Sequence, residues 1–134
     1  VLADVLYENA DLDSYDALVI PGGMPGTTNL GAHAGVCEQL KRACAQGRLI
    51  AAICAAPTVF GQLGLLQGKK AICFPGMEDQ LTGAEVTFES VVCDGNIITS
   101  RGMGTAIDFG LAILAYFEDK AAADELAKKI VYRA

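Results

Sequence analysis

The sequence has little positive charge, a single histidine and no tryptophan. It contains 10 Lys and Arg residues and 16 Asp and Glu residues, which gives a formal net charge of −6. Nucleic acids and anionic membranes attract clustered Lys and Arg side chains, and an acidic chain with few of them is a poor partner for either. The composition therefore argues against a nucleic-acid-binding protein and against a membrane-surface protein.

The cysteines lack the spacing of a metal or disulfide motif. They form no CxxC pair, and one histidine cannot complete a Cys/His zinc site. An odd number of cysteines at irregular spacing also argues against a disulfide framework, so we expect a reducing, cytoplasmic setting and neither metal nor cofactor. No apolar run reaches the roughly 18 residues that span a bilayer, which predicts no membrane segment. The cysteines are Cys37, Cys44, Cys54, Cys73 and Cys93.

Apolar residues and glycine are abundant instead. In a chain of 134 residues, 52% are hydrophobic and 15 are glycine. That content is too apolar for a disordered chain, and the length suits one domain with a sizeable core. Two apolar runs, 16–20 and 49–53, show no polar alternation, as expected for parallel strands covered on both faces. An amphipathic helix over 36–44 separates them, so we predict an α/β fold with helices on both faces of a mostly parallel sheet.

The rest of the chain continues the alternation. We expect a first short strand at 1–6, a loop at 24–28, a strand at 71–74, a hairpin of 87–92 and 96–100 turning at Asp94-Gly95, and helices over 107–117 and 121–132. A strand that starts at Val1 without Met suggests a domain that is N-terminally incomplete.

Cys54 is the candidate nucleophile. It directly follows the strand 49–53 and precedes Pro57, which suits the first turn of a helix, so it occupies the position of a nucleophile elbow. Ligands of such sheets bind beyond the carboxyl ends of the strands. The N–H groups of Ala55 and of Gly22 and Gly23, at a neighbouring strand end, would hold an oxyanion and stabilise a thiolate. The alternative is a cysteine that only packs in the core, which is the usual role of a free cysteine.

Other residues, several of them at strand ends, give weaker indications of a functional role. We interpret the four remaining cysteines as structural, with Cys93 the most surface-reactive of them, and His33 as an ordinary helix-start or loop residue. Arg101 either binds a carboxylate or a second subunit, or it makes a surface ion pair. Phe74 and Met103 are interpreted as pocket wall, and Glu78 and Asp79 as a solvated helix start rather than an acid/base pair.

Three segments together resemble one known family. They are YDALVIPGG (15–23), IAAICAAP (50–57) and TSRGMGTA (99–106). The chain resembles the ThiJ/PfpI superfamily, and most of all the branch of the parkinsonism-associated deglycase and its bacterial ThiJ-type relatives. The resemblance implies a flavodoxin-like three-layer sandwich, a homodimer, and Cys54 as the reactive residue with Gly23 and Ala55 as backbone donors. It also implies that Arg101 and Gly102 lie near the dimer interface and the Cys54 pocket.

The chain also departs from the family pattern. The first strands and helix of the family, with the glutamate that hydrogen-bonds the cysteine, have no counterpart in residues 1–134. We therefore expect one ThiJ/PfpI-like domain that lacks this part, supplied by about 50 upstream residues or by a separate chain. Phe74 occupies a position where some members have histidine. Ala55 follows the cysteine where the protease-like branch has histidine, which weakens a peptidase or amidase interpretation.

Two classes of function are the main candidates. In the first, Cys54 attacks a reactive carbonyl such as methylglyoxal, or an early glycated thiol or amine, as a glutathione-independent glyoxalase or deglycase does. In the second, the protein is a redox sensor or chaperone-like stress protein in which Cys54 is oxidised to sulfinic acid. A cysteine amidase or peptidase-like hydrolase is a third alternative.

Overall fold

The computed structural model describes residues 1–133. Short 3-10 turns connect several of its helices and strands. Its main elements are β1 (Ala17–Ile20), α1 (Gly26–Ala32), α2 (Ala34–Ala45), β2 (Leu49–Ile53), α3 (Pro57–Gln62), β3 (Lys70–Ala71), β4 (Glu85–Val86), β5 (Val91–Asp94), β6 (Ile97–Ser100), α4 (Ala106–Phe117) and α5 (Lys120–Lys129).

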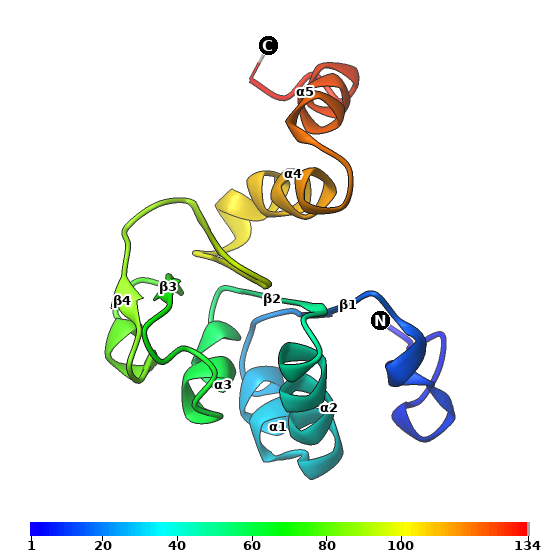
Figure 1. Ribbon diagram of the computed structural model, residues 1–134, viewed down its shortest axis with the longest axis vertical. Coiled ribbons are helices and arrows are strands. Elements are labelled where there is room, and N and C mark those ends of the chain that lie inside the picture. Colours follow the sequence, from blue (N-terminus) through cyan, green and yellow to red (C-terminus); the bar gives the residue numbers. More distant parts are fainter. Residues whose placement is uncertain (134) are drawn as a thin grey trace.

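The main sheet has the strand order β1-β2-β6-β5. Strands β1, β2 and β6 run parallel, and β5 joins β6 as an antiparallel hairpin. The hairpin turns at Gly95 and Asn96, one residue later than the expected Asp94-Gly95. Gly95 has a φ of 59°, so the glycine provides the positive φ that this turn requires. Helices α1, α2 and α3 lie on one face of the sheet and α4 lies on the other, with α5 packed on α4 (Figure 1). The predicted α/β sandwich with a mostly parallel sheet and a small hairpin is confirmed.

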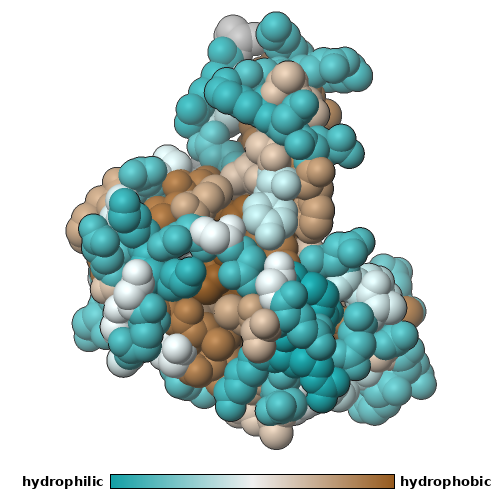
Figure 2. All heavy atoms as spheres, viewed as in Figure 1, coloured by the Kyte–Doolittle hydropathy of each residue, from teal (hydrophilic) through white to brown (hydrophobic). Residues whose placement is uncertain are grey.

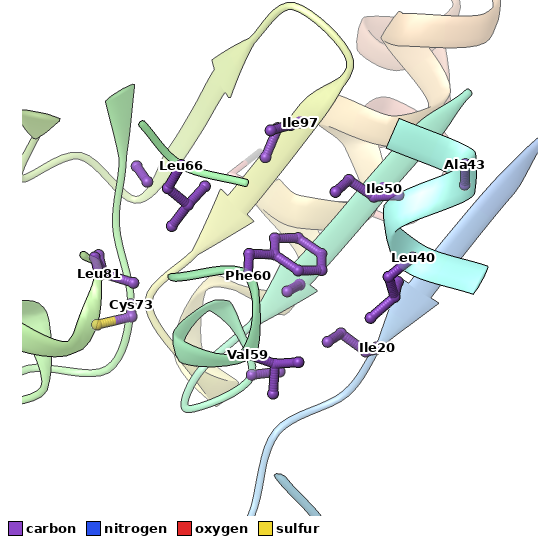
Figure 3. Packing of buried hydrophobic residues seen from close by; sticks show 13 residues of the cluster. Ile20, Leu40, Ala43, Ile50, Val59, Phe60, Leu66, Cys73, Leu81 and Ile97 are labelled. Atoms are coloured by element: carbon purple, nitrogen blue, oxygen red, sulfur yellow. The ribbon is translucent and has the colours of Figure 1, made fainter. Parts of the chain in front are cut away.

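The core forms around β2, whose residues from Leu49 to Ala52 are buried. On the α1–α3 side, Phe60 packs among aliphatic side chains from the strands and from α2 and α3 (Figure 3). On the opposite side, Phe109 of α4 packs against Leu49 and Ile98. Burial of both faces explains why β2 has no polar alternation and why its prediction from the sequence was correct.

Three expectations about local structure are wrong. Residues 1–6 form no strand and are exposed, because no described strand lies beside them to pair with their backbone groups. The expected loop at 24–28 is largely the start of helix α1, which begins where the Thr27 N–H donates to the Gly23 carbonyl oxygen. The expected strand at 71–74 is only the two-residue β3, which pairs with β4 in a separate small parallel sheet.

Two element boundaries also shift. Strand β5 begins at Val91 rather than at Thr87, and α5 ends at Lys129 rather than at Tyr132.

Apolar residues gather in the middle of the visible face, below α4, whereas hydrophilic residues coat α5 (Figure 2). Within the described residues, every helix is too short or too polar to cross a bilayer.

Candidate active site

Cys54 lies in the sharp turn between β2 and α3. Its φ is +66°, a left-handed backbone conformation that residues other than glycine rarely adopt. Its N–H donates to the Ser100 carbonyl oxygen at 3.0 Å, and its own carbonyl oxygen accepts from the Phe74 N–H at 2.8 Å. Hydrogen bonds to two different segments therefore hold this strained residue, whose side chain is half-buried. Backbone strain of this kind concentrates at functional sites.

Gly22 and Gly23 follow β1 and lie beside Cys54. A Cβ atom added to Gly22 would be 3.1 Å from the backbone nitrogen of Ala55 and still closer to Cys54. Gly23 has a φ of +89° and its carbonyl oxygen accepts from Thr27 at the start of α1. The structure thus brings together Gly22, Cys54 and Ala55, which the sequence analysis assigned to one site from two separate strand ends.

Three backbone N–H groups beside Cys54 have no hydrogen-bond acceptor within the described residues. The N–H groups of Gly22, Gly23 and Ala55 donate to no other atom of residues 1–133. The Ala55 carbonyl oxygen, in contrast, accepts from both the N–H and the hydroxyl of Thr58, at 3.1 and 2.7 Å. The Ala55 N–H belongs to the same peptide group as the Cys54 carbonyl, which accepts from the Phe74 N–H at 2.8 Å, so the orientation of this donor is set before any ligand arrives.

Cys54 opens into a hollow of about 340 Å³. Its walls are almost entirely apolar, and they include Ile53, Ala106 and Met103. Met103 also borders a second hollow of about 420 Å³, whose walls include Phe74 and Arg101. No Asp, Glu or His of residues 1–133 lines either hollow, so these walls offer a thiol and backbone donors but no acid/base side chain.

A hydroxyl network orders the loop from Arg101 to Thr105. The Ser100 hydroxyl donates to the Ser90 carbonyl oxygen at 2.7 Å and lies 2.6 Å from the Thr105 hydroxyl. The Thr105 hydroxyl in turn accepts from the Gly102 N–H at 3.1 Å. Ser100 and Thr105 were not among the site residues expected from the sequence. Their position in TSRGMGTA, directly around Arg101 and Met103, was the available signal.

Arg101 makes no ion pair within the described residues, and its Nε is buried without a hydrogen-bond partner there. Its side chain borders the hollow that Phe74 and Met103 also line. The interpretation of Arg101 as a surface ion pair therefore has no support among residues 1–133.

The other cysteines differ from Cys54 in environment. Burial, with the carboxylates of Glu78 and Asp79 and the nearby Cys54, raises the pKa of Cys73 to about 12. Partial burial, and after it the carboxylate of Glu89, raises the pKa of Cys93. Cys93 is exposed, as expected for the most accessible of the four, yet its environment disfavours the thiolate that reacts.

His33 and Glu78 have structural contacts away from Cys54. His33 caps helix α2, where its Nδ1 accepts from the Val36 N–H at 3.0 Å, and its ring packs against Tyr7. A Glu78 carboxylate oxygen accepts from the Gly76 N–H at 2.8 Å at the start of a short 3-10 turn. Both arrangements agree with the helix-start roles expected from the sequence.

Comparison with known proteins assigns the chain to a family. The model of the DJ-1/PfpI family matches residues 1–116. The chain belongs to the DJ-1/PfpI family. Among curated DJ-1/PfpI relatives, DJ-1 homolog B of Arabidopsis thaliana is 40% identical over 129 residues, which are 96% of this chain and 30% of that protein. The chain thus spans less than a third of that relative.

Two further relatives carry names that state an activity. A glutathione-independent glyoxalase of Caenorhabditis elegans is 33% identical over 132 residues, which are 97% of this chain and 70% of the glyoxalase. A deglycase of Pyrococcus abyssi is 35% identical over 107 residues, which are 78% of this chain and 63% of the deglycase. Enzymatic activity on this family's scaffold is therefore supported by named relatives.

Solved structures of the DJ-1/PfpI family share the fold. Oxidised Toxoplasma gondii DJ-1 superposes with a TM-score of 0.85 at 38% identity, over 91% of this chain and 67% of that one. Drosophila melanogaster DJ-1beta superposes with a TM-score of 0.82 at 39% identity, over the same 91% and 67%. The flavodoxin-like sandwich expected from the resemblance is confirmed by these neighbours.

Proposed function

We propose that the protein is a cysteine-dependent enzyme of the glyoxalase or deglycase type, which acts on small reactive carbonyl compounds. The observation that carries the proposal is the position of Cys54 at a strained strand-to-helix turn, which we interpret as a nucleophile elbow. The N–H groups of Gly23 and Ala55 lie beside it and have no hydrogen-bond acceptor within the described residues. The names of the worm glyoxalase and the archaeal deglycase support the same class of activity.

The chemistry begins at the Cys54 sulfur. The thiolate attacks the aldehyde carbon of a 2-oxoaldehyde, a C–S bond forms, and the carbonyl electron pair moves to oxygen. The N–H groups of Ala55 and Gly23 stabilise that oxyanion, which becomes the hydroxyl of a hemithioacetal on protonation. The apolar walls that include Ile53 and Met103 limit the access of water to this step.

The remaining steps need a base. It removes the proton from the former aldehyde carbon, the resulting enediol takes up a proton at the neighbouring carbon, and a thioester of a 2-hydroxy acid forms. Water then hydrolyses the thioester, which frees the Cys54 thiol and the 2-hydroxy acid, so the overall reaction adds one water and needs no oxidant. The walls of both hollows lack such a base within residues 1–133. We place it on a segment outside these residues, as part of a larger sheet that extends beyond β1.

Proton NMR with methylglyoxal tests the proposal at two levels. In this chain, Cys54 should form the hemithioacetal, and the whole protein should produce lactate. Cys54→Ala should abolish both signals, whereas Cys93→Ala, a matched removal of an exposed thiol, should preserve them. Lactate production that is unchanged in Cys54→Ala would refute the assignment of the nucleophile.

The same geometry supports a second function, in which Cys54 senses peroxide. Hydrogen bonds from Ala55 and Gly23 would hold the oxygens of a sulfinic acid as they would hold an oxyanion. The raised pKa values of Cys73 and Cys93 leave those thiols less reactive. Peptide mass mapping after mild peroxide should find two added oxygens at Cys54 first, and uniform oxidation of all five cysteines would exclude a sensor.

We also propose that the protein functions as a homodimer. Met103 is 93% exposed and Phe74 is 47% exposed on the wall of the larger hollow, and the buried Nε of Arg101 lies there without a partner in the described residues. A second copy packed on this apolar wall would bury it and complete the surroundings of Cys54. The free state of all five cysteines suits the reducing cytoplasm as the location.

A further inference from the structure

A third hollow, of about 320 Å³, lies between α1 and α3. It shares no lining residue with the two hollows beside Cys54. Its polar lining consists of hydroxyl and amide side chains, and its apolar lining includes Met24 and Val59. The proposed enzymatic reaction gives this hollow no role, so its chemistry is argued from its own residues.

Thr27 provides the strongest indication of a ligand. The residue is only 3% exposed, and its hydroxyl oxygen is buried without a hydrogen-bond partner among the described residues. Buried hydroxyls in folded proteins are almost always paired, because an unpaired one has lost its hydration without compensation. Thr27 also lines the hollow, so a rotation of its side chain about χ1 would bring this hydroxyl within reach of a hydroxyl-bearing ligand there.

Two neighbours have unused acceptor capacity. The Thr58 hydroxyl donates to the Ala55 carbonyl oxygen at 2.7 Å, which leaves its oxygen able to accept. The Gln62 amide nitrogen donates to the Gly31 carbonyl oxygen at 2.9 Å, which leaves the amide oxygen as an acceptor. Together with Gln80, these groups both donate and accept, as hydroxyl groups of a ligand require.

The hollow contains no charge. None of its lining residues is ionisable, and the charged residues next to Gln80 along the chain, Glu78 and Asp79, are acidic. A charged ligand would lose hydration without gaining an opposite charge, and an anion would also be repelled. The volume is at the lower end of small-molecule sites, which suits a single sugar ring rather than a nucleotide.

We propose that the hollow between α1 and α3 binds a small uncharged polyhydroxy compound of monosaccharide size. The ligand's hydroxyl groups would bond to Thr27, Thr58 and Gln62, and the C–H faces of its ring would pack on Met24 and Val59. The site lies outside the Cys54 hollows, and its occupancy does not depend on the reactivity of Cys54.

Ligand-detected saturation-transfer NMR with glucose as the probe tests this site. Thr27→Val removes the unpaired hydroxyl and keeps the shape of the side chain, so the variant should fold and bind glucose about three- to tenfold more weakly. Thr27→Ser, which keeps the hydroxyl, should retain binding, and so should Cys54→Ala. Thr82→Val, the same change at an exposed residue outside the hollow, is the matched control.

Two results would overturn the proposal. One is the absence of saturable glucose binding to the wild-type protein, or equal affinity in Thr27→Val. The other is that glucose 6-phosphate binds as tightly as glucose, because the uncharged lining predicts that a phosphate weakens binding. Loss of lactate production with intact glucose binding would affect only the enzymatic proposal.

Discussion

Gly22 lies so close to Cys54 that a Cβ atom on Gly22 would be 2.6 Å from the Cβ of Cys54. The same added atom would be 2.8 Å from the carbonyl oxygen of Ile53, which is backbone and cannot rotate away. The end of β1 therefore touches the turn that carries the candidate nucleophile, and glycine is required there by close approach rather than by a positive φ.

Gly22→Ala tests this contact. The clash should push the Cys54 turn away from β1, lower the free energy of unfolding by about 1–3 kcal/mol, and reduce thiol reactivity at Cys54. Urea unfolding and alkylation rates measure the two effects. Gly110→Ala is the control, because an added Cβ on Gly110 meets nothing within 4 Å, and alanine in the interior of α4 should stabilise the protein by about 0.5–1 kcal/mol. Equal stability of Gly22→Ala and wild type would contradict the packing described.

Cys54→Gly should show that backbone strain is present at the site. The left-handed conformation at Cys54 costs a residue with a Cβ atom about 1–2 kcal/mol, and glycine relieves this cost. The greater freedom of glycine in the unfolded chain offsets about 0.4–1 kcal/mol of that stabilisation. Cys54→Gly should therefore be more stable than Cys54→Ala by about 0.5–1 kcal/mol, as measured by urea unfolding. Both variants remove the thiol, so greater stability of the alanine variant would mean that the turn is unstrained.

The thiols should differ in their reactivity toward iodoacetamide at pH 8. Cys54 should react before Cys93, although Cys93 is exposed, and Cys73 should remain unmodified because its pKa is about 12. The Glu89 carboxylate disfavours the Cys93 thiolate, so Glu89→Gln should lower the pKa of Cys93 and accelerate its alkylation at constant pH. Peptide mapping by mass spectrometry follows each site. If the alkylation rate of Cys93 is unchanged in Glu89→Gln, burial alone raises the pKa of Cys93, and Glu89 makes no contribution.

The elements that the sequence predicts well are those with an extended pattern. Strand β2 is an uninterrupted apolar run because both of its faces are buried, and helix α2 shows apolar residues at spacing four because one side lies on the sheet. Cys54 was identified by the same means, since a buried strand that ends in Cys-Ala-Ala-Pro predicts a strand-to-helix turn.

The elements that the sequence predicts poorly depend on partners rather than on pattern. Residues 1–6 are apolar except for Asp4, as in a short strand, but they have no neighbour to pair with among the described residues. Strand β3 has only two residues, too few for any periodicity, and it exists because β4 lies beside it. The contact of Gly22 with Cys54 and the unpaired hydroxyl of Thr27 arise from tertiary packing, which no local pattern encodes.

Dimer formation through the apolar wall should depend on Met103. Met103→Asp would place an unpaired carboxylate in the buried interface, which should weaken self-association about tenfold or more. Phe88→Asp makes a similar change at a residue that is 69% exposed and lies outside the hollows, so it should leave the dimer intact. Sedimentation velocity over a range of concentrations distinguishes the two. A dimer that persists in Met103→Asp would show that the interface lies on another surface.

The free edge of β1 should be visible in amide hydrogen exchange. The Leu49 N–H donates to the Asp16 carbonyl oxygen at 3.3 Å, whereas the Ile50 N–H donates to the Asn96 carbonyl oxygen at 3.0 Å, so alternate residues of β2 bond to β1 and to β6. With Ala17 in register with Leu49, the Leu18 N–H points toward β2 and the Val19 N–H points away from it.

In this chain alone, Val19 should therefore exchange rapidly, and Leu18 should be protected. If the sheet extends beyond β1, as proposed for the segment that carries the base, a strand paired with this edge would protect Val19 in the whole protein. Hydrogen exchange followed by NMR compares the two forms. Interior β2 amides such as that of Ala51 are the control, because they should be protected in both. Rapid exchange of Val19 in the whole protein would show that no further strand pairs with β1, and the base would then have to reach Cys54 from an element that does not join the sheet.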